Sequence, residues 1–296
     1  MKTALQIACK EFSDRFRSGW VIACTAVWLG AIALTSLFGL IQIGKIGWQG
    51  YERTVVSLLN LVQYLVPLLA LLLGHDLVVS EREDRTIALS IASGVSRAQL
   101  LIGKFIGGCL ALAFPVSLGF VIAGVVIGLG AGRSGLASFI VLAFSGLGLG
   151  VIFLALGLVV SIFCSTRVQS LVAALLVWCA AVFVFDLVAL GVVVSTRTNE
   201  ATKQIESVTD AMHVNAIADM HQAFESGVDN VPQAKPAATK ILFWTLLANP
   251  VDLFRVINLP VTTEARVPAP VIPLAFACWI ALVLSAGFWR LRRLDL

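Results

Sequence analysis

The sequence predicts an all-α membrane protein with six transmembrane helices. Hydrophobic residues make up 59% of its 296 residues and charged residues only 13%, whereas about 25% of the residues of a soluble domain are charged. Several apolar runs exceed the roughly 20 residues with which a helix crosses about 30 Å of hydrocarbon. Strand-length segments of alternating apolar and polar residues are absent from the sequence, which argues against an outer-membrane barrel.

The six spans follow from the lengths of the apolar runs. They cover residues 20–43, 54–79, 100–131, 136–164, 168–195 and 268–289. Before the first span, Leu5, Ala8, Phe12 and Phe16 recur at helical spacing. This pattern predicts an amphipathic helix at the membrane interface over residues 1–19, and an ordinary cap on the first span is the alternative.

Glycine pairs at a spacing of four residues occur in the third and fourth predicted spans. They are Gly103/Gly107, Gly124/Gly128 and Gly146/Gly150. Because a glycine has no side chain, such pairs let two helices approach closely. The pattern therefore predicts tight packing but does not identify which helices pair.

Lys and Arg in the short loops indicate the orientation in the membrane. With the N-terminus inside, the short outer links hold only Lys45, Arg53 and Arg133. The inner side holds twelve basic residues, which are Lys2, Lys10, Arg15, Arg17, Arg82, Arg85, Arg97, Lys104, Arg167, Arg290, Arg292 and Arg293. The sequence therefore predicts a multi-pass protein of the plasma (inner) membrane with both termini in the cytoplasm.

The long link at 196–267 is predicted to be an extracytoplasmic helical segment. Apolar residues at helical spacing between Ile205 and Phe224 indicate a helix over residues 200–226. Residues 241–260 are interpreted as a re-entrant or interfacial pair of helices, broken at the Asn-Pro dipeptide, because an aspartate and an arginine are unfavourable in the middle of a span. The polar residues that we expect to shape this pair are Asn249, Asp252, Arg255 and Asn258.

Few residues carry a pattern that indicates catalysis, a cofactor or a metal. The stretch 39–46 resembles a phosphate-binding loop, but Ile46 stands where Ser or Thr would hold Mg²⁺ and no strand precedes it. Six scattered cysteines form no Cys-x-x-Cys pair.

Met and His are copper ligands. The sequence holds two adjacent Met-His pairs, Met212 with His213 and Met220 with His221. On one helix the two pairs would lie about 12 Å apart, which is too far to share an ion. We expect neither an ATPase site nor a cofactor in this chain, and whether those four residues bind a metal stays open.

Four polar residues within the predicted spans are candidates for the bundle interior or a gate. They are Gln63, His75, Asp76 and Asp186. Ionisable residues are costly inside a membrane, so they usually face the interior and serve a function. The structural alternative is that they satisfy the backbone of a broken helix.

Five consecutive charged residues lie between the second and third spans, in a chain with only 17 acidic and 21 basic residues. The charged run and its threonine comprise Glu81, Arg82, Glu83, Asp84, Arg85 and Thr86. A short amphipathic helix, a turn and Arg97 follow before the chain re-enters the membrane. This segment predicts a cytoplasmic docking surface for a partner protein, and a solvated turn is the alternative.

This charged run, followed by Gly94-Val95-Ser96-Arg97 and Gly103-Lys104, resembles the coupling region of ABC-2 type transporter permeases. The sequence departs from the family in three places. Arg85 replaces the usual glycine, Ser93-Gly94 replaces the usual proline, and residues 196–240 resemble an extra helical insertion. The resemblance implies a type V exporter-like permease that forms a homodimer. It also implies a coupling helix within residues 80–99 that docks a separate cytoplasmic ATPase, which binds the ATP and Mg²⁺.

Three further stretches are similar to the permeases of the Nos system, which supports copper-centre maturation of nitrous oxide reductase. They are residues 66–76, 183–188 and 249–259. This resemblance implies coupling to an extracytoplasmic partner on the 200–226 helix. The alternatives are an ion-coupled secondary carrier that uses His75, Asp76 and Asp186, and a non-transporting membrane anchor that transmits mechanical force. The sequence indicates neither a substrate nor a direction of transport.

Overall fold

The computed structural model describes residues 2–43, 47–87, 92, 94–131, 136–184, 187, 249–258 and 271–293, and these form helices and short connections. Among these residues, five helices are long and apolar enough to cross a membrane, and six if a bent pair at the N-terminus counts as one span. The described part of the chain is therefore helical, and the protein is a multi-pass membrane protein. It divides into one unit of residues 1–181 with 250–296 and a second unit of 182–249, of which only 182–184, 187 and 249 are described.

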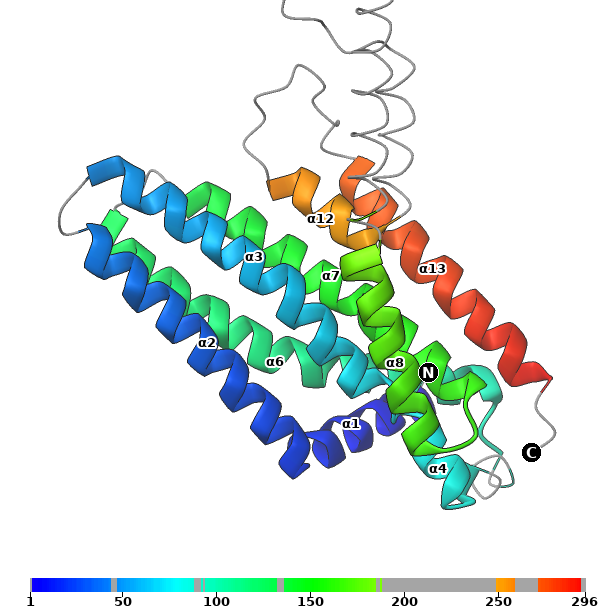
Figure 1. The fold of residues 1–296 in the computed structure, drawn as a ribbon. Helices are drawn as coiled ribbons and strands as arrows, with labels where there is room; N and C mark the ends of the chain where they lie inside the picture. Colours follow the sequence, from blue (N-terminus) through cyan, green and yellow to red (C-terminus); the bar gives the residue numbers. More distant parts are fainter. Residues whose placement is uncertain are drawn as a thin grey trace, which may run out of the picture. The chain divides into compact units, whose positions relative to one another are not determined.

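The helices of the first unit follow the predicted spans to within a few residues at most ends. In chain order they are α1 (Lys2–Phe16), α2 (Gly19–Ile43), α3 (Gly47–Gly74), α4 (Val79–Glu83), α6 (Arg97–Ala131), α7 (Leu136–Phe163), α8 (Arg167–Cys179), α12 (Pro250–Asn258) and α13 (Val271–Arg292) (Figure 1). A π-helical turn, η2 (Ala180–Val184), continues α8. Most of the predicted segment 196–267 lies outside the described residues.

The N-terminal helix α1 is bent by 69° from α2 and packs against α6 (Figure 1). Two glycines of α6 make this contact close. A Cβ placed on Gly103 would lie 2.8 Å from Cβ of Ile7, and one on Gly107 would lie 2.7 Å from Cβ of Glu11. The first glycine pair of the sequence therefore accommodates α1, while its location at a membrane interface stays a prediction.

The centre of the bundle is the pair of helices α3 and α7, which run side by side (Figure 1). Apolar side chains such as Val66 and Phe153 are fully buried there. Near one end the two backbones touch, because a Cβ placed on Gly74 would lie only 2.9 Å from Cα of Gly157. Such an approach is possible only where both residues lack a side chain.

The second predicted span is interrupted just after this contact. α3 ends at Gly74, and the chain turns before α4 begins at Val79. Side chains of neighbouring helices form hydrogen bonds with backbone N–H and C=O groups at this break. Ser161 of α7 accepts the N–H groups of Val78 and Val79, each at 2.9 Å, and the hydroxyl of Ser170 in α8 donates to the carbonyl of His75 at 2.7 Å. The break is therefore held in place from two sides.

Candidate functional site

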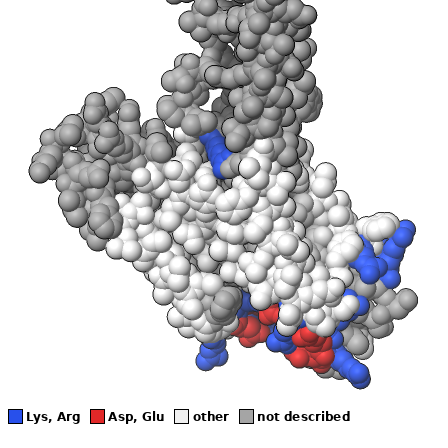
Figure 2. Space-filling view, viewed as in Figure 1, with Lys and Arg blue, Asp and Glu red and all other residues white. Residues whose placement is uncertain are grey.

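Most of the described charged side chains gather at one end of the first unit. Here α1, the turn at residues 75–78, α4 and the first turns of α6 and α8 come together. Figure 2 shows the Asp and Glu atoms concentrated there among Lys and Arg atoms, while the sides of the bundle are almost free of charge. We call this region the charged end, and it contains the charged run at 81–85.

Lys104 of α6 lies at the centre of the charged end. Its side chain is almost completely buried, with the residue 1% exposed, and its Nζ lies 3.0 Å from Oε2 of Glu11 and 3.0 Å from Oε1 of Glu81. A buried cation is tolerated when carboxylates compensate its charge. One side chain of α6 therefore links α1 to α4. The sequence analysis did not predict that Lys104 pairs with Glu11 and Glu81. A lysine one to two turns into a span nevertheless indicates that an acidic partner is needed.

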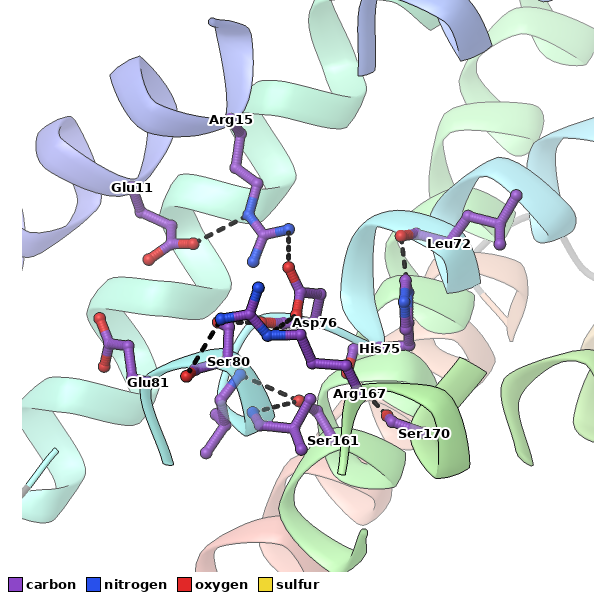
Figure 3. A network of polar contacts seen from close by, with 12 residues as sticks. Glu11, Arg15, Leu72, His75, Asp76, Ser80, Glu81, Ser161, Arg167 and Ser170 are labelled. Atoms are coloured by element: carbon purple, nitrogen blue, oxygen red, sulfur yellow. Dashed lines mark hydrogen bonds and ion pairs between the residues drawn. The ribbon is translucent and has the colours of Figure 1, made fainter. Parts of the chain in front are cut away.

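Arg15 extends the ionic contacts from α1 to the turn after α3. Its Nε donates to Glu11 at 3.0 Å, and one of its terminal nitrogens lies 3.5 Å from Oδ2 of Asp76 (Figure 3). Burial by itself would raise the pKa of Glu11, but the charges of Lys104 and Arg15 and their hydrogen bonds outweigh it and hold this pKa below its usual value. The structure thus favours the ionised form of Glu11.

Arg167, the first residue of α8, binds the charged run from the other side. Its guanidinium lies 3.0 Å from Glu83 and 2.7 Å from Asp84. It also lies 3.8 Å from Asp76 (Figure 3). Its backbone N–H also donates to Oε1 of Glu83 at 2.8 Å. The carboxylate of Glu83 therefore lies at the positive end of α8, where a negative charge is favourable.

The charged run ends in a tight turn in which Arg85 has a φ of 55°. This is the left-handed region, which favours glycine because a Cβ is strained there. The conformation gives a physical reason for the glycine that ABC-2 permeases usually have at this place. The side chain of Asp84 is 61% exposed, and Arg85 and Thr86 are exposed as well. We call these three residues the exposed turn.

The other members of the predicted docking set are held within the chain or lie apart. Glu81 and Glu83 form the ion pairs described above, and Arg82 donates to the carbonyl of Cys164 at 3.3 Å. Arg97 donates to the carbonyls of Leu291 and Arg292 at the end of α13, at 3.0 and 2.7 Å. Of the amphipathic helix predicted after the charged run, only Thr86, Ile87 and Ala92 are described, and Ile87 is buried.

The structure separates the residues expected in the bundle interior or gate. His75 and Asp76 lie in the turn between α3 and α4, where Nδ1 of His75 contacts the carbonyl of Leu72 at 2.8 Å (Figure 3). Gln63 lies three turns earlier in α3 and is buried beside α12, where its Oε1 accepts from Nε of Arg255 at 2.7 Å. Asp186 lies outside the described residues.

The polar residues predicted around the Asn-Pro dipeptide lie on or beside α12. Pro250 begins this helix, at the position where a proline is best tolerated. Asp252 in its first turn pairs with Arg255 at 3.0 Å, and Asn258 donates to the hydroxyl of Ser145 in α7 at 2.9 Å. Asn249 precedes the helix and is buried. A helix thus follows the dipeptide, at Pro250–Asn258. The re-entrant or interfacial pair stays a prediction, since residues 241–248 lie outside the described part of the chain.

No group of three or more His, Cys, Asp or Glu residues that could hold a metal ion occurs among the described residues. Met212, His213, Met220 and His221, together with the whole 200–226 helix, lie outside them. The candidate site is therefore the charged end, whose chemistry consists of ion pairs and hydrogen bonds. These contacts can hold the helices together, and they position the exposed turn where a partner protein can bind it.

Comparisons with known proteins agree on one family. Residues 5–296 match the family model described as "ABC-2 family transporter protein". A protein of Pseudomonas aeruginosa named "Probable ABC transporter permease protein NosY" is 31% identical over 299 residues, which cover 97% of this chain and 94% of the relative. A protein of the same name from Stutzerimonas stutzeri is 30% identical over 99% of each chain. An ABC permease implies a partner ATPase, which is typically a separate subunit. The chain therefore belongs to the ABC-2 family of transporter proteins.

Proposed function

We propose that this chain is the permease of a Nos-type ABC transporter. It would couple ATP hydrolysis by a separate cytoplasmic ATPase to export or to the movement of an extracytoplasmic partner. Two relatives at about 30% identity carry the name NosY. With the resemblance of residues 66–76 and 249–259 to Nos-system permeases, this supports a role in copper-centre maturation of nitrous oxide reductase.

The observation that carries the proposal is the exposed turn and the way it is held. Asp84, Arg85 and Thr86 face outward, while the ion pairs just before them reach α6 through Lys104 and α8 through Arg167. A force applied to the exposed turn would therefore act on these helices together instead of bending a free loop. In this proposal the charged end lies in the cytoplasm, as the distribution of Lys and Arg predicts.

A route from the charged end to the middle of α3 is part of the proposal. Asp76, just after α3, is held between Arg15 and Arg167. Gln63 lies eleven residues before the end of α3, or about 17 Å along the helix, and it bonds to Arg255 of α12. A shift of α3 would thus reach α12, which lies within the predicted extracytoplasmic segment 196–267. This arrangement suits a mechanical role as well as transport, and the 200–226 helix is the proposed site for the extracytoplasmic protein.

A second copy of the chain is expected to pack against α8. This helix exposes a row of apolar side chains at helical spacing, including Val168 at 73% and Leu176 at 65%. Its first residue is Arg167, which holds the charged run. A dimer formed along this face would place the two exposed turns on one assembly, as two docked ATPases require.

Co-purification with the cognate ATPase tests the proposal. Arg85→Glu combined with Thr86→Glu makes the exposed turn acidic and leaves the ion pairs of Lys104 and Arg167 unchanged. We expect at least a tenfold loss of co-purified ATPase, with normal insertion of the permease. Lys10→Glu, a charge reversal at an exposed residue of α1, is the matched control and should retain the ATPase. Equal recovery of ATPase with the double variant would contradict docking at this turn.

A complementation experiment tests the Nos branch separately. The chain would replace NosY in Pseudomonas aeruginosa, and the visible absorption of the copper centres of nitrous oxide reductase would be measured. Restored copper centres are expected. If the copper centres stay absent although the chain binds the host ATPase, the Nos role is wrong, while the role as a permease subunit stands.

A further inference from the structure

The arginines at the end of α13 differ from Lys104, Arg15 and Arg167 in their contacts with carboxylates. Lys104, Arg15 and Arg167 each contact at least two carboxylates. In the part of the chain that the structure describes, no such ion pair is formed by Arg97, Arg290, Arg292 or Arg293. Asp295, which follows Arg293 closely in the sequence, lies outside the described residues. Positive charge is therefore in excess at this place, and Figure 2 shows Lys and Arg atoms on the side where α13 ends.

Three of these arginines lie over aromatic rings. The guanidinium carbon of Arg293 is 3.9 Å from the ring centroid of Trp289, that of Arg292 is 4.4 Å from Phe288, and that of Arg290 is 5.6 Å from Phe163 at the end of α7. A guanidinium stacked on a ring keeps its N–H groups directed outward from its edge. The stacking thus orders several hydrogen-bond donors that have no carboxylate acceptor among the described residues.

The rings belong to a surface that faces away from the rest of the bundle. Trp289 is 54% exposed, and Leu282, seven residues earlier on the same face of α13, is 63% exposed. Phe163 is also exposed. An apolar helix face that ends in a tryptophan and then arginines is typical of a span that passes from hydrocarbon into the headgroup layer.

Two further features make this end of α13 favourable for an anion. The last carbonyls of a helix carry a partial negative charge, which would repel an anionic group. Arg97 donates to the carbonyls of Leu291 and Arg292 and so compensates that charge. In addition, Nε of Arg290 is buried and has no hydrogen-bond acceptor in the described part of the chain.

We propose that the end of α13 binds an anionic phospholipid. The phosphate of the lipid is held by the guanidinium groups of Arg292 and Arg293, with Arg290 beside them, and an acyl chain lies along Trp289 and Leu282. Charge complementarity favours this occupant over a second copy of the chain. A two-fold contact would bring the same arginines against each other. The inference does not depend on the proposed function.

The experiment uses the full chain in nanodiscs of phosphatidylcholine that contain a small fixed fraction of a brominated lipid. Bromine quenches tryptophan fluorescence at contact, and Trp289→Phe, which retains an aromatic ring, identifies the part of the signal that comes from Trp289 among seven tryptophans. We expect brominated phosphatidylglycerol to quench Trp289 more strongly than brominated phosphatidylcholine. The expected preference is about fivefold for each arginine, since a basic residue near an anionic surface contributes about 1 kcal/mol.

Arg292→Gln with Arg293→Gln should abolish the preference. These residues are exposed, so the fold should persist, and quenching by brominated phosphatidylcholine verifies that Trp289 still meets lipid. Arg17→Gln, at an exposed arginine in the turn that follows α1, is the matched control and should retain the preference. An equal loss with Arg17→Gln would show that basic residues attract the lipid diffusely, and it would overturn the proposed site.

Absence of quenching by both lipids would mean that protein covers this face. Displacement of the lipid by inorganic phosphate alone would show a simple anion site. Each of the last two results would also overturn the proposal.

Discussion

Lys104 and Glu81 form an ion pair, with Nζ and Oε1 only 3.0 Å apart. Glu81 belongs to the charged run between two predicted spans, whereas Lys104 is buried in α6. The pair therefore turns a residue of the candidate docking segment toward the helix bundle. Together with Glu11, which lies 3.0 Å from the same lysine nitrogen, it joins three helices through one side chain.

Lys104→Met should strongly destabilise the chain. The substitution leaves two carboxylates without their shared cation, and removal of one partner of a buried pair costs about 3–5 kcal/mol. The free energy of unfolding in detergent would be measured. Adding Glu11→Gln and Glu81→Gln to Lys104→Met removes the unpaired charges and should recover most of the loss. An unchanged free energy for Lys104→Met alone would contradict the ionic role of this residue.

Arg85→Gly should stabilise the exposed turn. A residue with a Cβ is strained at a φ of 55°, and a glycine relieves that strain although it adds freedom to the unfolded chain. We expect a gain of about 0.5–1 kcal/mol in the free energy of unfolding. Arg85→Ala is the control, because it removes the same charge but keeps the Cβ and should give no gain. Equal effects of glycine and alanine would mean that the backbone conformation is not the cause.

Gly107→Ala should displace α1 from α6. The new Cβ would lie 2.7 Å from Cβ of Glu11 and 2.8 Å from the carbonyl oxygen of Ala8, and overpacking of this kind costs about 1–3 kcal/mol. Thermal unfolding in detergent would report the loss. Gly30→Ala is the matched control, since nothing lies within 4 Å of its Cβ position. If both substitutions lower the unfolding temperature equally, the loss does not come from the contact of α1 with α6.

Ser161→Ala should weaken the break between α3 and α4. The hydroxyl accepts the N–H groups of Val78 and Val79, and a buried donor without a partner costs about 1–3 kcal/mol. Hydrogen exchange at these two amides would become faster. Ser285→Ala, at an exposed serine whose hydroxyl donates within its own helix, should leave the exchange unchanged. Unaltered exchange in Ser161→Ala would show that this hydroxyl does not hold the turn.

Acid should release α1 through protonation of Glu11. Its pKa is lower in the folded chain than the ordinary value of 4.5, so the ionised residue contributes stability that is fully present above this value. That stability is lost as the pH falls through the lowered pKa. The unfolding temperature would be measured between neutral pH and about pH 3. Glu11→Gln should flatten the dependence, whereas Asp14→Asn, at an exposed residue of the same helix, should retain most of it.

The apolar runs predicted the helices well because the length needed to cross a membrane is a property of consecutive residues. α6 and α7 begin and end within a few residues of the predicted spans. The same local reasoning placed the helix that begins at Pro250. It also marked Arg85 as a departure from the family pattern, but the left-handed φ that explains the usual glycine appears only in the folded chain.

The pairing of side chains was not predictable in the same way. Gly103 and Gly107 were expected to join two helices, and their partner is α1. Gln63 was grouped with His75 and Asp76, although it bonds to Arg255, 192 residues away along the chain.

The sequence by itself determined that this chain is a helical membrane protein with a concentrated charged run. Only the tertiary structure decided that Glu81 and Glu83 face Lys104 and Arg167, which leaves Asp84, Arg85 and Thr86 exposed. The physical reason is that an ion pair depends on a separation of a few ångströms. For residues as distant in sequence as Glu11 and Lys104, 93 positions apart, helix packing sets that separation.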